Sequence, residues 1–244
     1  MPAEPVLYPV SLDVAGRSCL VVGGGTIAAG KVAGLLAAGA AVTVVAPDVD
    51  AAIDALATAG DPANDGTADD GTANDSTAND GTAEPGGPGS VTVRRRPYRA
   101  GEAADYRLVV TATGIAAVDG TVAADATAAA VWVNSADDPG RCTFHLPSVH
   151  RDGPVSVAVS TGGASPALAI WLRRRAADAL GTGLGDLAGL LDEARRRLQA
   201  AGRPTSSVDW PTVLDGPLPQ LVRDGRLDEA RQLLADTVDH SAAP

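Results

Sequence analysis

CLVVGGGTIAAGKVAGLLAAGAAVTVVA, residues 19–46, is the stretch of this 244-residue chain that decides its fold. A short apolar run over residues 17–22 ends in glycines, as a buried parallel strand does. Residues 31–39 carry apolar side chains at helical spacing and end on a glycine, and residues 41–46 form a second buried strand. Strand, glycine turn, helix and strand within about 30 residues are typical of a βαβ unit.

The glycine turn between strand and helix has the residue types that a dinucleotide-binding loop requires. Gly23 permits the turn out of the strand, Gly25 lets the backbone approach a pyrophosphate, and Ala28 is small enough for close helix–strand packing. The N-terminus of the following helix faces the phosphates. Because the G-x-G-x-x-A pattern lies between a strand and a helix, we predict dinucleotide binding at Gly23, Gly24 and Gly25. The alternative is a purely structural glycine turn.

The choice of cofactor depends on the residues that follow the second strand. Asp48 comes directly after Pro47, where an acidic side chain is expected to hold the ribose hydroxyls. No arginine lies beside it for a 2′-phosphate, so NAD is favoured over NADP. The alternative is that Asp48 is only a turn residue.

Composition argues against several classes of function. The formal net charge is −11, but residues 61–90 hold seven acidic side chains and no basic one, and without these seven the charge is −4. The chain therefore gives no electrostatic case for nucleic-acid binding. Cys19 and Cys142 lie far apart without disulfide or metal spacing, which favours a reduced, cytoplasmic location. No secretory pattern is visible in residues 1–11, and no apolar run approaches the roughly 18 residues of a membrane span.

A repeat of period five fills residues 63–83, which read ANDGT, ADDGT, ANDST and ANDGT. Asn, Asp and Gly favour turns, and nothing in the repeat can bury a core. We therefore predict that residues 61–90 are a disordered insertion rather than a solenoid. Calcium binding is the alternative, but no Glu closes a loop of the EF-hand kind.

The rest of the chain continues the α/β pattern and then becomes helical. Further strands are predicted at residues 91–93, 107–113, 131–134 and 154–160, with a helix over 118–130. Helices are then predicted over residues 166–180, 186–201, 211–221 and 227–238. The predicted architecture is an α/β Rossmann-type parallel sheet at residues 1–153, followed by a smaller strand-containing region at 154–182 and a helical region at 183–244.

A first candidate for chemistry is Asn134-Ser135-Ala136-Asp137-Asp138-Pro139. It follows a predicted central strand at its carboxyl end, where open α/β sheets bind their ligands. A carboxylate there can move a proton while a hydride passes to a nicotinamide. The alternative is an Asp-Asp-Pro turn.

A second candidate is Ser160-Thr161-Gly162-Gly163-Ala164-Ser165-Pro166. Ser165 as N-cap and Pro166 as first helical residue predict a helix start. The Thr-Gly-Gly backbone beside that start offers donors for an anion such as a substrate carboxylate. A plain strand-to-helix turn is the alternative. His145 and His150 lack a Cys or carboxylate partner at ligand spacing, so no metal site is predicted.

Together these motifs resemble those of a known family, the precorrin-2 dehydrogenases of sirohaem synthesis, including the N-terminal part of multifunctional sirohaem synthases. The resemblance is carried by N-x-x-D-x-P from Asn134, F-x-L-P from Phe144 and S-T-G-G-x-S-P from Ser160, in this order. It also runs through Tyr8–Leu12 and Val21–Pro47 and covers nearly the whole chain apart from the insertion.

The resemblance implies an NAD-dependent oxidation of precorrin-2 to sirohydrochlorin, which in some members is followed by insertion of ferrous iron. It implies that Asp137 is the catalytic residue, acting in proton transfer or metal positioning. The implied cofactor-binding positions are Thr26, Ile27, Pro47, Asp48 and Thr113. The implied positions for the tetrapyrrole carboxylates are Asn134, Thr161, Gly162, Gly163 and Ser165. Residues 154–182 are implied to form a homodimer whose cleft is shared by two chains.

One departure from the family pattern concerns the fourth strand. Family members often carry Ala-Thr-Asp after it, whereas this chain has Ala112-Thr113-Gly114, and the lost carboxylate can alter cofactor binding. Two other functions remain open. One is an NAD-binding regulatory or sensor module without turnover, and the other is a dehydrogenase that acts on a different small polycarboxylate.

Overall fold

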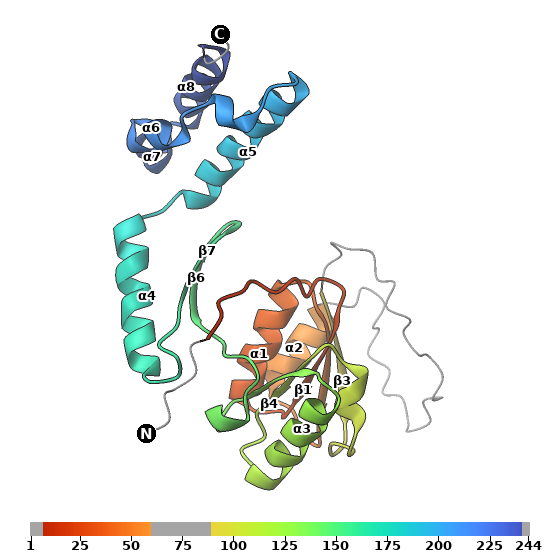
Figure 1. Cartoon of the computed structure of the whole chain (residues 1–244). Helices are drawn as coiled ribbons and strands as arrows, with labels where there is room; N and C mark the ends of the chain where they lie inside the picture. The colour runs from red at the N-terminus through yellow and green to blue at the C-terminus, as the bar shows by residue number, and fades with distance from the viewer. Residues whose placement is uncertain (1–6, 60–88, 241–244) are drawn as a thin grey trace. The chain divides into compact units, whose positions relative to one another are not determined.

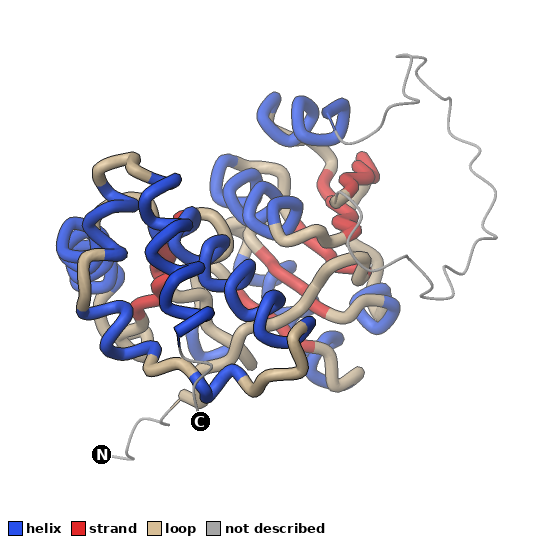
Figure 2. The backbone as a smooth tube through the Cα atoms, turned by 90° about the horizontal axis from the view of Figure 1, so that it is seen from above, coloured by secondary structure: helices blue, strands red, loops and turns tan. Residues whose placement is uncertain are grey.

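The computed structural model of the chain describes residues 7–59 and 89–240. They form two compact units that divide between Leu146 and Pro147 (Figure 1). The expected boundary after residue 153 lies in the turn of a hairpin, and the division into three parts stays a prediction. Figure 2 separates the helices and strands of both units by colour.

The first unit is a five-stranded sheet in which every neighbouring pair of strands is parallel. Its elements are β1 (Ser18–Val22), α1 (Thr26–Ala37), β2 (Ala41–Ala46), α2 (Ala51–Ala59), β3 (Ser90–Arg95), η1 (Glu102–Asp105), β4 (Leu108–Thr111), α3 (Ala116–Ala128), β5 (Trp132–Ser135) and η2 (Pro139–Arg141). The strand order is β3-β2-β1-β4-β5, so the chain reverses direction across the sheet between β1 and β4. Ligands of open α/β sheets bind at this switch point, outside the carboxyl ends of the strands.

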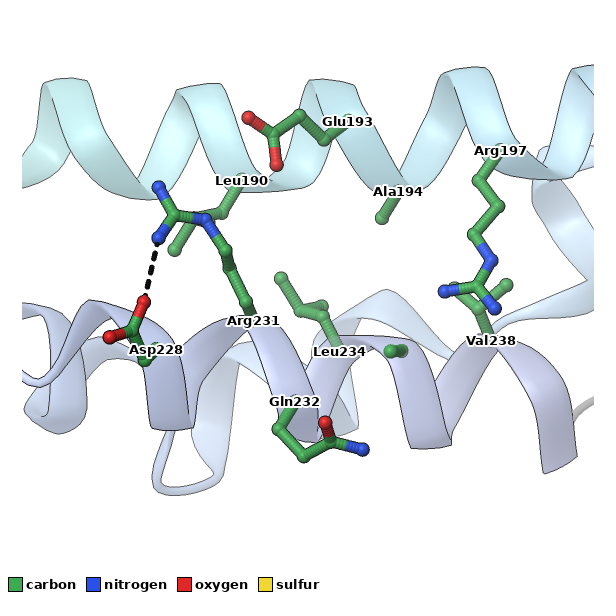
Figure 3. A pocket seen from close by; sticks show the side chains of 10 residues that line it. Leu190, Glu193, Ala194, Arg197, Asp228, Arg231, Gln232, Leu234 and Val238 are labelled. Carbon is green, nitrogen blue, oxygen red and sulfur yellow. Dashed lines mark hydrogen bonds and ion pairs between the residues drawn. The ribbon is translucent and has the colours of Figure 1, made fainter.

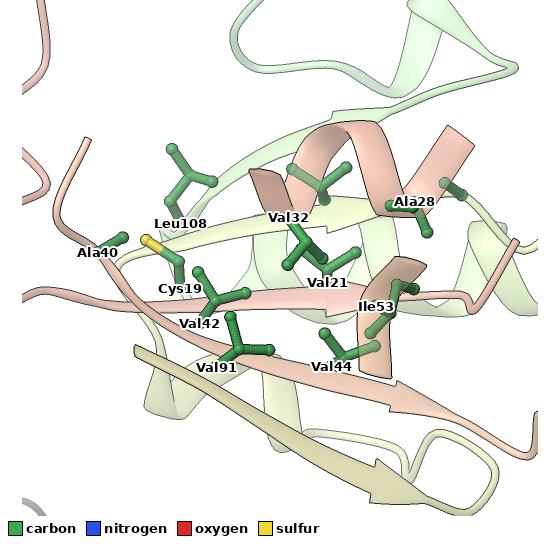
Figure 4. Packing of buried hydrophobic residues seen from close by; sticks show 13 residues of the cluster. Cys19, Val21, Ala28, Val32, Ala40, Val42, Val44, Ile53, Val91 and Leu108 are labelled. Carbon is green, nitrogen blue, oxygen red and sulfur yellow. The ribbon is translucent and has the colours of Figure 1, made fainter. Parts of the chain in front are cut away.

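Small apolar side chains hold helices on both faces of this sheet. On one face, Cys19 and Val21 of β1 pack against Val32 of α1 and Ile53 of α2, all fully buried (Figure 4). On the other face, strand residues such as Leu20 and Val109 pack against α3. Because β-branched and alanine side chains fill both layers, the helices lie close to the sheet.

The second unit consists of an antiparallel hairpin and a group of helices. Its elements are β6 (Ser148–Asp152), β7 (Val155–Val159), α4 (Pro166–Leu180), α5 (Leu184–Ala200), η3 (Thr205–Ser207), α6 (Trp210–Asp215), α7 (Leu218–Arg223) and α8 (Leu227–His240). Helix α4 packs on both strands of the hairpin (Figure 1). Helices α5, α7 and α8 enclose a separate core around the fully buried Leu198 and Leu218.

The predicted α/β class, the glycine turn and the helical C-terminal region are confirmed. Four details of the prediction were wrong. Helix α1 starts at Thr26, helix α2 was not predicted, and β7 has an unpredicted partner strand in β6. The single helix predicted over 211–221 is two helices, because Gly216 and Pro217 interrupt it.

The predicted insertion over residues 61–90 lies outside the described residues except at its end. There Ser90 belongs to β3 and pairs with Ala41 of β2, so the insertion cannot extend to residue 90. The strand was predicted only from residue 91 because Ser90 is polar and exposed, so the alternating apolar pattern does not include it.

Candidate active site at the carboxyl ends of the strands

The glycine loop lies at the end of β1, directly at the switch point. Gly23 has φ +125°, a conformation that favours glycine, and a Cβ there would lie 2.6 Å from the carbonyl carbon of Ala112. A Cβ on Gly24 would clash with the carbonyl oxygen of Asp48. A Cβ on Gly25 would meet nothing within 4 Å, so the space above this residue is open. The first two glycines therefore pack the loop, and the third leaves room for a ligand.

Helix α1 begins at this loop with its first backbone N–H groups available. Gly25 is its N-cap, and no side chain of the described residues provides a capping hydrogen bond there. Thr26 and Ile27 in the first turn are exposed, whereas Ala28 is fully buried against the sheet. Uncapped N–H groups at a helix N-terminus bind phosphate well. The loop thus has the donors and the open space that a dinucleotide pyrophosphate needs.

The loop after β2 lies against the glycine loop. The backbone N–H of Asp50 donates to the carbonyl of Gly24 at 2.7 Å, and the Asp50 carboxylate accepts from Thr26 Oγ1 at 3.2 Å and from the N–H of Ala52 at 2.9 Å. Asp50, which the sequence did not single out, is thereby engaged in holding α2 and the glycine loop together. Pro47 and Asp48 are exposed, and Asp48 makes no hydrogen bond or ion pair to another described residue. Its carboxylate is therefore available to a ligand.

Arginines reach the same edge of the sheet from β3. The register places Arg95 opposite Ala46 at the end of β2, and Arg94 opposite Val45. Arg95 forms an exposed ion pair with Asp54 of α2 at 2.7 Å. No hydrogen bond or ion pair joins Asp48 to Arg94 or Arg95, so the preference for NAD over NADP stays a prediction. Only the pairing of β3 with β2 brings these two arginines to the end of β2.

The turn after β4 forms the other side of the switch point. Thr113 donates through Oγ1 to the carboxylate of Asp119 at 2.8 Å, and its backbone N–H donates to the same oxygen at 3.2 Å. Gly114, where family members often have an aspartate, has φ +69°. Ile115 follows as the N-cap of α3 and is 58% exposed, as is Ile27. Two apolar side chains thus lie open to solvent at the starts of α1 and α3, which flank the switch point.

Asp137 lies just beyond the carboxyl end of β5, at the same edge of the sheet. It is exposed and makes no hydrogen bond or ion pair to another described residue. Its neighbour Asp138 is engaged instead, since it pairs with Arg141 at 2.7 Å and accepts from the N–H of Gly140 at 3.0 Å. Two adjacent carboxylates therefore differ in role, and only Asp137 is available for chemistry.

The segment around Asp137 is fastened to the sheet by buried polar contacts. Asn134 is buried and donates its amide to the carbonyl of Phe144 at 3.1 Å. The sulfur of Cys142 accepts from the N–H of Ser135 at 3.2 Å, and burial raises the pKa of this thiol. The hydroxyl of Ser135 is buried without a hydrogen-bond partner among the described residues. The Asn134 side chain thus holds the loop through its bond to Phe144, while the Ser135 hydroxyl has no hydrogen-bond partner among the described residues.

The Thr-Gly-Gly loop belongs to the second unit, between β7 and α4. The predicted helix start is confirmed, because Ser165 caps α4 by accepting from the N–H of Leu168 at 3.2 Å. Thr161 Oγ1 accepts from the N–H of Ser165 and donates to its carbonyl, both at 3.1 Å. Gly162 and Gly163 have positive φ and are exposed. The threonine and serine hydroxyls shape the turn, and the N–H of Gly162 donates to Ser160 Oγ at 3.2 Å, so the Gly163 N–H is the glycine donor that no described residue engages.

Two further features of the described residues bear on function. No group of three or more His, Cys, Asp or Glu within the described ranges has metal-ligating geometry, and no helix there is long and apolar enough to cross a membrane. A groove lies between α5 and α8, with an apolar floor of Leu190 and Leu234 and a rim that includes the Arg231–Asp228 ion pair (Figure 3). It contains none of the predicted site residues.

The strand order, the switch point and the uncapped glycine loop define a dinucleotide-binding protein of the Rossmann class. Comparison with known proteins agrees. The chain belongs to the family described as putative NAD(P)-binding, whose profile matches residues 10–148. The profile of the sirohaem biosynthesis protein central region matches residues 152–177. The resemblance to sirohaem-synthesis proteins is thereby confirmed.

Individual relatives point in the same direction. The chain is 34% identical to the siroheme synthase of Methylococcus capsulatus, over 96% of this chain and 44% of the relative. It is also 34% identical to the siroheme synthase of Nitrosospira multiformis, over 93% of this chain and 43% of the relative. The chain thus spans less than half the length of these curated relatives. Among solved structures, SirC, precorrin-2 dehydrogenase, matches with a TM-score of 0.66 and 25% identity, over 94% of this chain and all of that one.

Proposed function

We propose that this protein oxidises precorrin-2 to sirohydrochlorin, with NAD as the hydride acceptor. The observation that carries the proposal is Asp137, an exposed carboxylate without a partner among the described residues, at the sheet edge that also holds the glycine loop. The printed activity of the matching solved structure, precorrin-2 dehydrogenase, and the siroheme synthase relatives support the choice of substrate.

The first unit supplies the residues that would hold the dinucleotide. The N–H groups at the start of α1 would bind the pyrophosphate, and Asp48 would accept hydrogen bonds from the ribose hydroxyls. Thr113 and the exposed Ile27 border the switch point on either side. A bound nicotinamide would supply the hydride acceptor for this oxidation.

Asp137 accepts the proton that leaves as the tetrapyrrole is oxidised, which balances the reaction as loss of one hydride and one proton. An exposed carboxylate without an ion-pair partner keeps its lone pairs available for this transfer. Cys142 and Asn134 keep its loop fixed on β5. The backbone N–H of Gly163 beside the α4 N-terminus would bind a substrate carboxylate, with Gly162 held by Ser160 and with Thr161 and Ser165 shaping that turn.

Anaerobic conversion of precorrin-2, followed by absorbance with NAD and then with NADP, tests the proposal. Formation of sirohydrochlorin with concomitant NADH is expected. Binding of NADH without any turnover would favour a regulatory module, and turnover of another polycarboxylate alone would favour a different dehydrogenase. Ferrous ion added after oxidation tests iron insertion, in which iron is a second substrate and Asp137 is again the residue expected to act.

Asp48 is expected to set the preference for NAD over NADP. Asp48→Ala removes the acceptor for the ribose hydroxyls, so KM for NAD is expected to rise about tenfold, while KM for NADP falls because a negative charge no longer opposes the 2′-phosphate. Asp48→Asn is the matched variant: it keeps an acceptor and loses the charge, so NAD binding weakens less. Steady-state kinetics with both cofactors measure the ratio, and an unchanged ratio in both variants would contradict the assignment.

We also propose that the protein is a homodimer formed through the region at 154–182. Helix α4 exposes large apolar side chains, namely Leu168, Ile170, Trp171, Leu172 and Leu180. Exposed apolar surface of this kind marks an interaction face. Trp171→Glu is expected to convert dimer to monomer in light scattering, whereas the polar-site change Arg174→Glu on the same helix is not. A monomeric wild type would contradict the proposal.

A cytoplasmic location also stays a prediction.

A further inference from the structure

A buried carboxylate lies under the nucleotide side of the switch point and has no role so far. Asp119, in the first turns of α3, is 5% exposed. Its Oδ1 accepts hydrogen bonds from the hydroxyl of Thr111 on β4, from the hydroxyl of Thr113 at 2.8 Å and from the N–H of Thr113 at 3.2 Å. One oxygen atom therefore joins the last residue of β4, the turn that follows it and the helix after the turn.

The turn that Asp119 holds has little else to define it. Besides its bonds to Asp119, the Thr113 hydroxyl accepts from the N–H of Ile115 at 3.0 Å. Gly114 adopts φ +69°, and Ile115 at the N-cap offers α3 no side-chain cap. Glycine in a turn has many accessible conformations, so the observed one depends on its fixed neighbours. The most firmly bonded of these neighbours is Thr113, which Asp119 holds through two hydrogen bonds.

This turn is in contact with the pyrophosphate loop. A Cβ on Gly23 would lie 2.6 Å from the carbonyl carbon of Ala112 and 3.1 Å from the backbone nitrogen of Thr113. The N–H of Ala112 donates to the carbonyl of Val22 at 2.8 Å, which ties the end of β4 to the end of β1. A shift of Thr113 would therefore alter the wall opposite the glycine loop.

We propose that Asp119 is a positioning residue of the nucleotide site, which holds the turn at residues 113–115 against the glycine loop. It acts through Thr113 and does not itself contact the ligand. The inference rests on the proposed function in one respect, that the ligand of this site is a nicotinamide dinucleotide. The turn itself has Gly114 where family members often have an aspartate. Asp119 places a carboxylate beneath that turn instead.

The test measures NADH affinity by fluorescence and thermal stability in the same variants. Asp119→Ala leaves the N–H of Thr113 and the hydroxyl of Thr111 without their acceptor, so the Kd for NADH is expected to rise about tenfold. Asp119→Asn retains an oxygen acceptor in the same place and is expected to restore most of the affinity. If Asp119→Ala does not fold, Thr113→Val serves instead, because it removes the hydroxyl that bonds Asp119 and Ile115 and leaves the Thr113 N–H bond and the Thr111–Asp119 bond in place. Its Kd is expected to rise about three- to tenfold.

Asp125 on the same helix is the matched control. Its carboxylate accepts from the hydroxyl of Tyr98 at 3.0 Å and from the N–H of Gly101 at 2.7 Å, on the connection that precedes β4. Asp125→Ala is expected to lower the melting temperature and leave the Kd for NADH unchanged.

Each result has a definite consequence. Lower stability of Asp119→Ala with unchanged Kd, or an unchanged Kd in Thr113→Val, overturns the positioning role. A wild type that binds NADH but does not oxidise precorrin-2 refutes the proposed function and leaves the positioning role standing. A wild type that binds no NADH overturns both.

Discussion

Asp137→Asn is expected to lower the rate of precorrin-2 oxidation by about 10²–10⁴-fold, the usual contribution of a general base. The amide cannot accept the proton, yet it matches the carboxylate in size, so the fold and the cofactor site are retained. Affinity for NADH, measured by fluorescence, is expected to stay at the wild-type value because Asp137 follows β5, two strands from the glycine loop on β1. A loss of rate with unchanged NADH affinity assigns the effect to the chemical step.

Asp138→Asn is the natural control, since the two carboxylates are adjacent in the chain. Asp138 is engaged with Arg141 and Gly140, so its replacement is expected to loosen the turn slightly, with a much smaller loss of rate. Exposed ion pairs contribute only about 0–1 kcal/mol, which limits the effect on stability. A wild-type rate in Asp137→Asn would remove this residue from the mechanism. Equal losses in both variants would point to the turn rather than to one carboxylate.

The second large effect is expected in the glycine loop, where neighbouring glycines should respond differently to alanine. Gly24→Ala places a methyl group against the Asp48 carbonyl, and both partners are backbone that cannot move cheaply. Overpacking of this kind costs about 1–3 kcal/mol or more, so the melting temperature is expected to fall and the dinucleotide site to be lost. Gly25→Ala meets nothing in the protein and is expected to fold normally. Its methyl group occupies the space over the helix N-terminus, so the Kd for NADH is expected to rise at least about tenfold.

Gly30→Ala supplies the control within the same helix. Gly30 is exposed, and a Cβ there meets nothing within 4 Å. Alanine at a helix interior is favoured over glycine by about 0.5–1 kcal/mol, so this variant is expected to be slightly more stable with unchanged NADH affinity. Calorimetry and NADH titration of the three variants separate packing from ligand approach. Normal NADH binding by Gly25→Ala would mean that no phosphate lies over this loop.

Local patterns in the sequence determined much of the fold. The βαβ unit, the glycine turn and the start of α4 follow from spacings within a few residues, because strand burial, φ preferences and helix capping act over that range. The motifs around Asp137 and Thr161 also belong to this group, since each lies within a single strand-end segment. Helix α2 was missed although Ile53, Leu56 and Ala57 have helical spacing and pack on the core, because it is a short helix of nine residues.

Strand order decided what the sequence alone did not. Arg94 and Arg95 lie beside the last two residues of β2 only because β3 pairs with β2 in this register. Asp119 joins two threonines that lie on the preceding strand and turn, and only packing of α3 on the sheet buries Asp119 and Thr111 and brings Thr113 to them. Likewise, Asp138 is occupied by Arg141 and Asp137 is not, a difference that two adjacent identical residues do not reveal in sequence. Hydrogen bonds and register depend on atoms brought together from distant positions, so only the tertiary structure distinguishes the side chains that hold the site from those left available to a ligand.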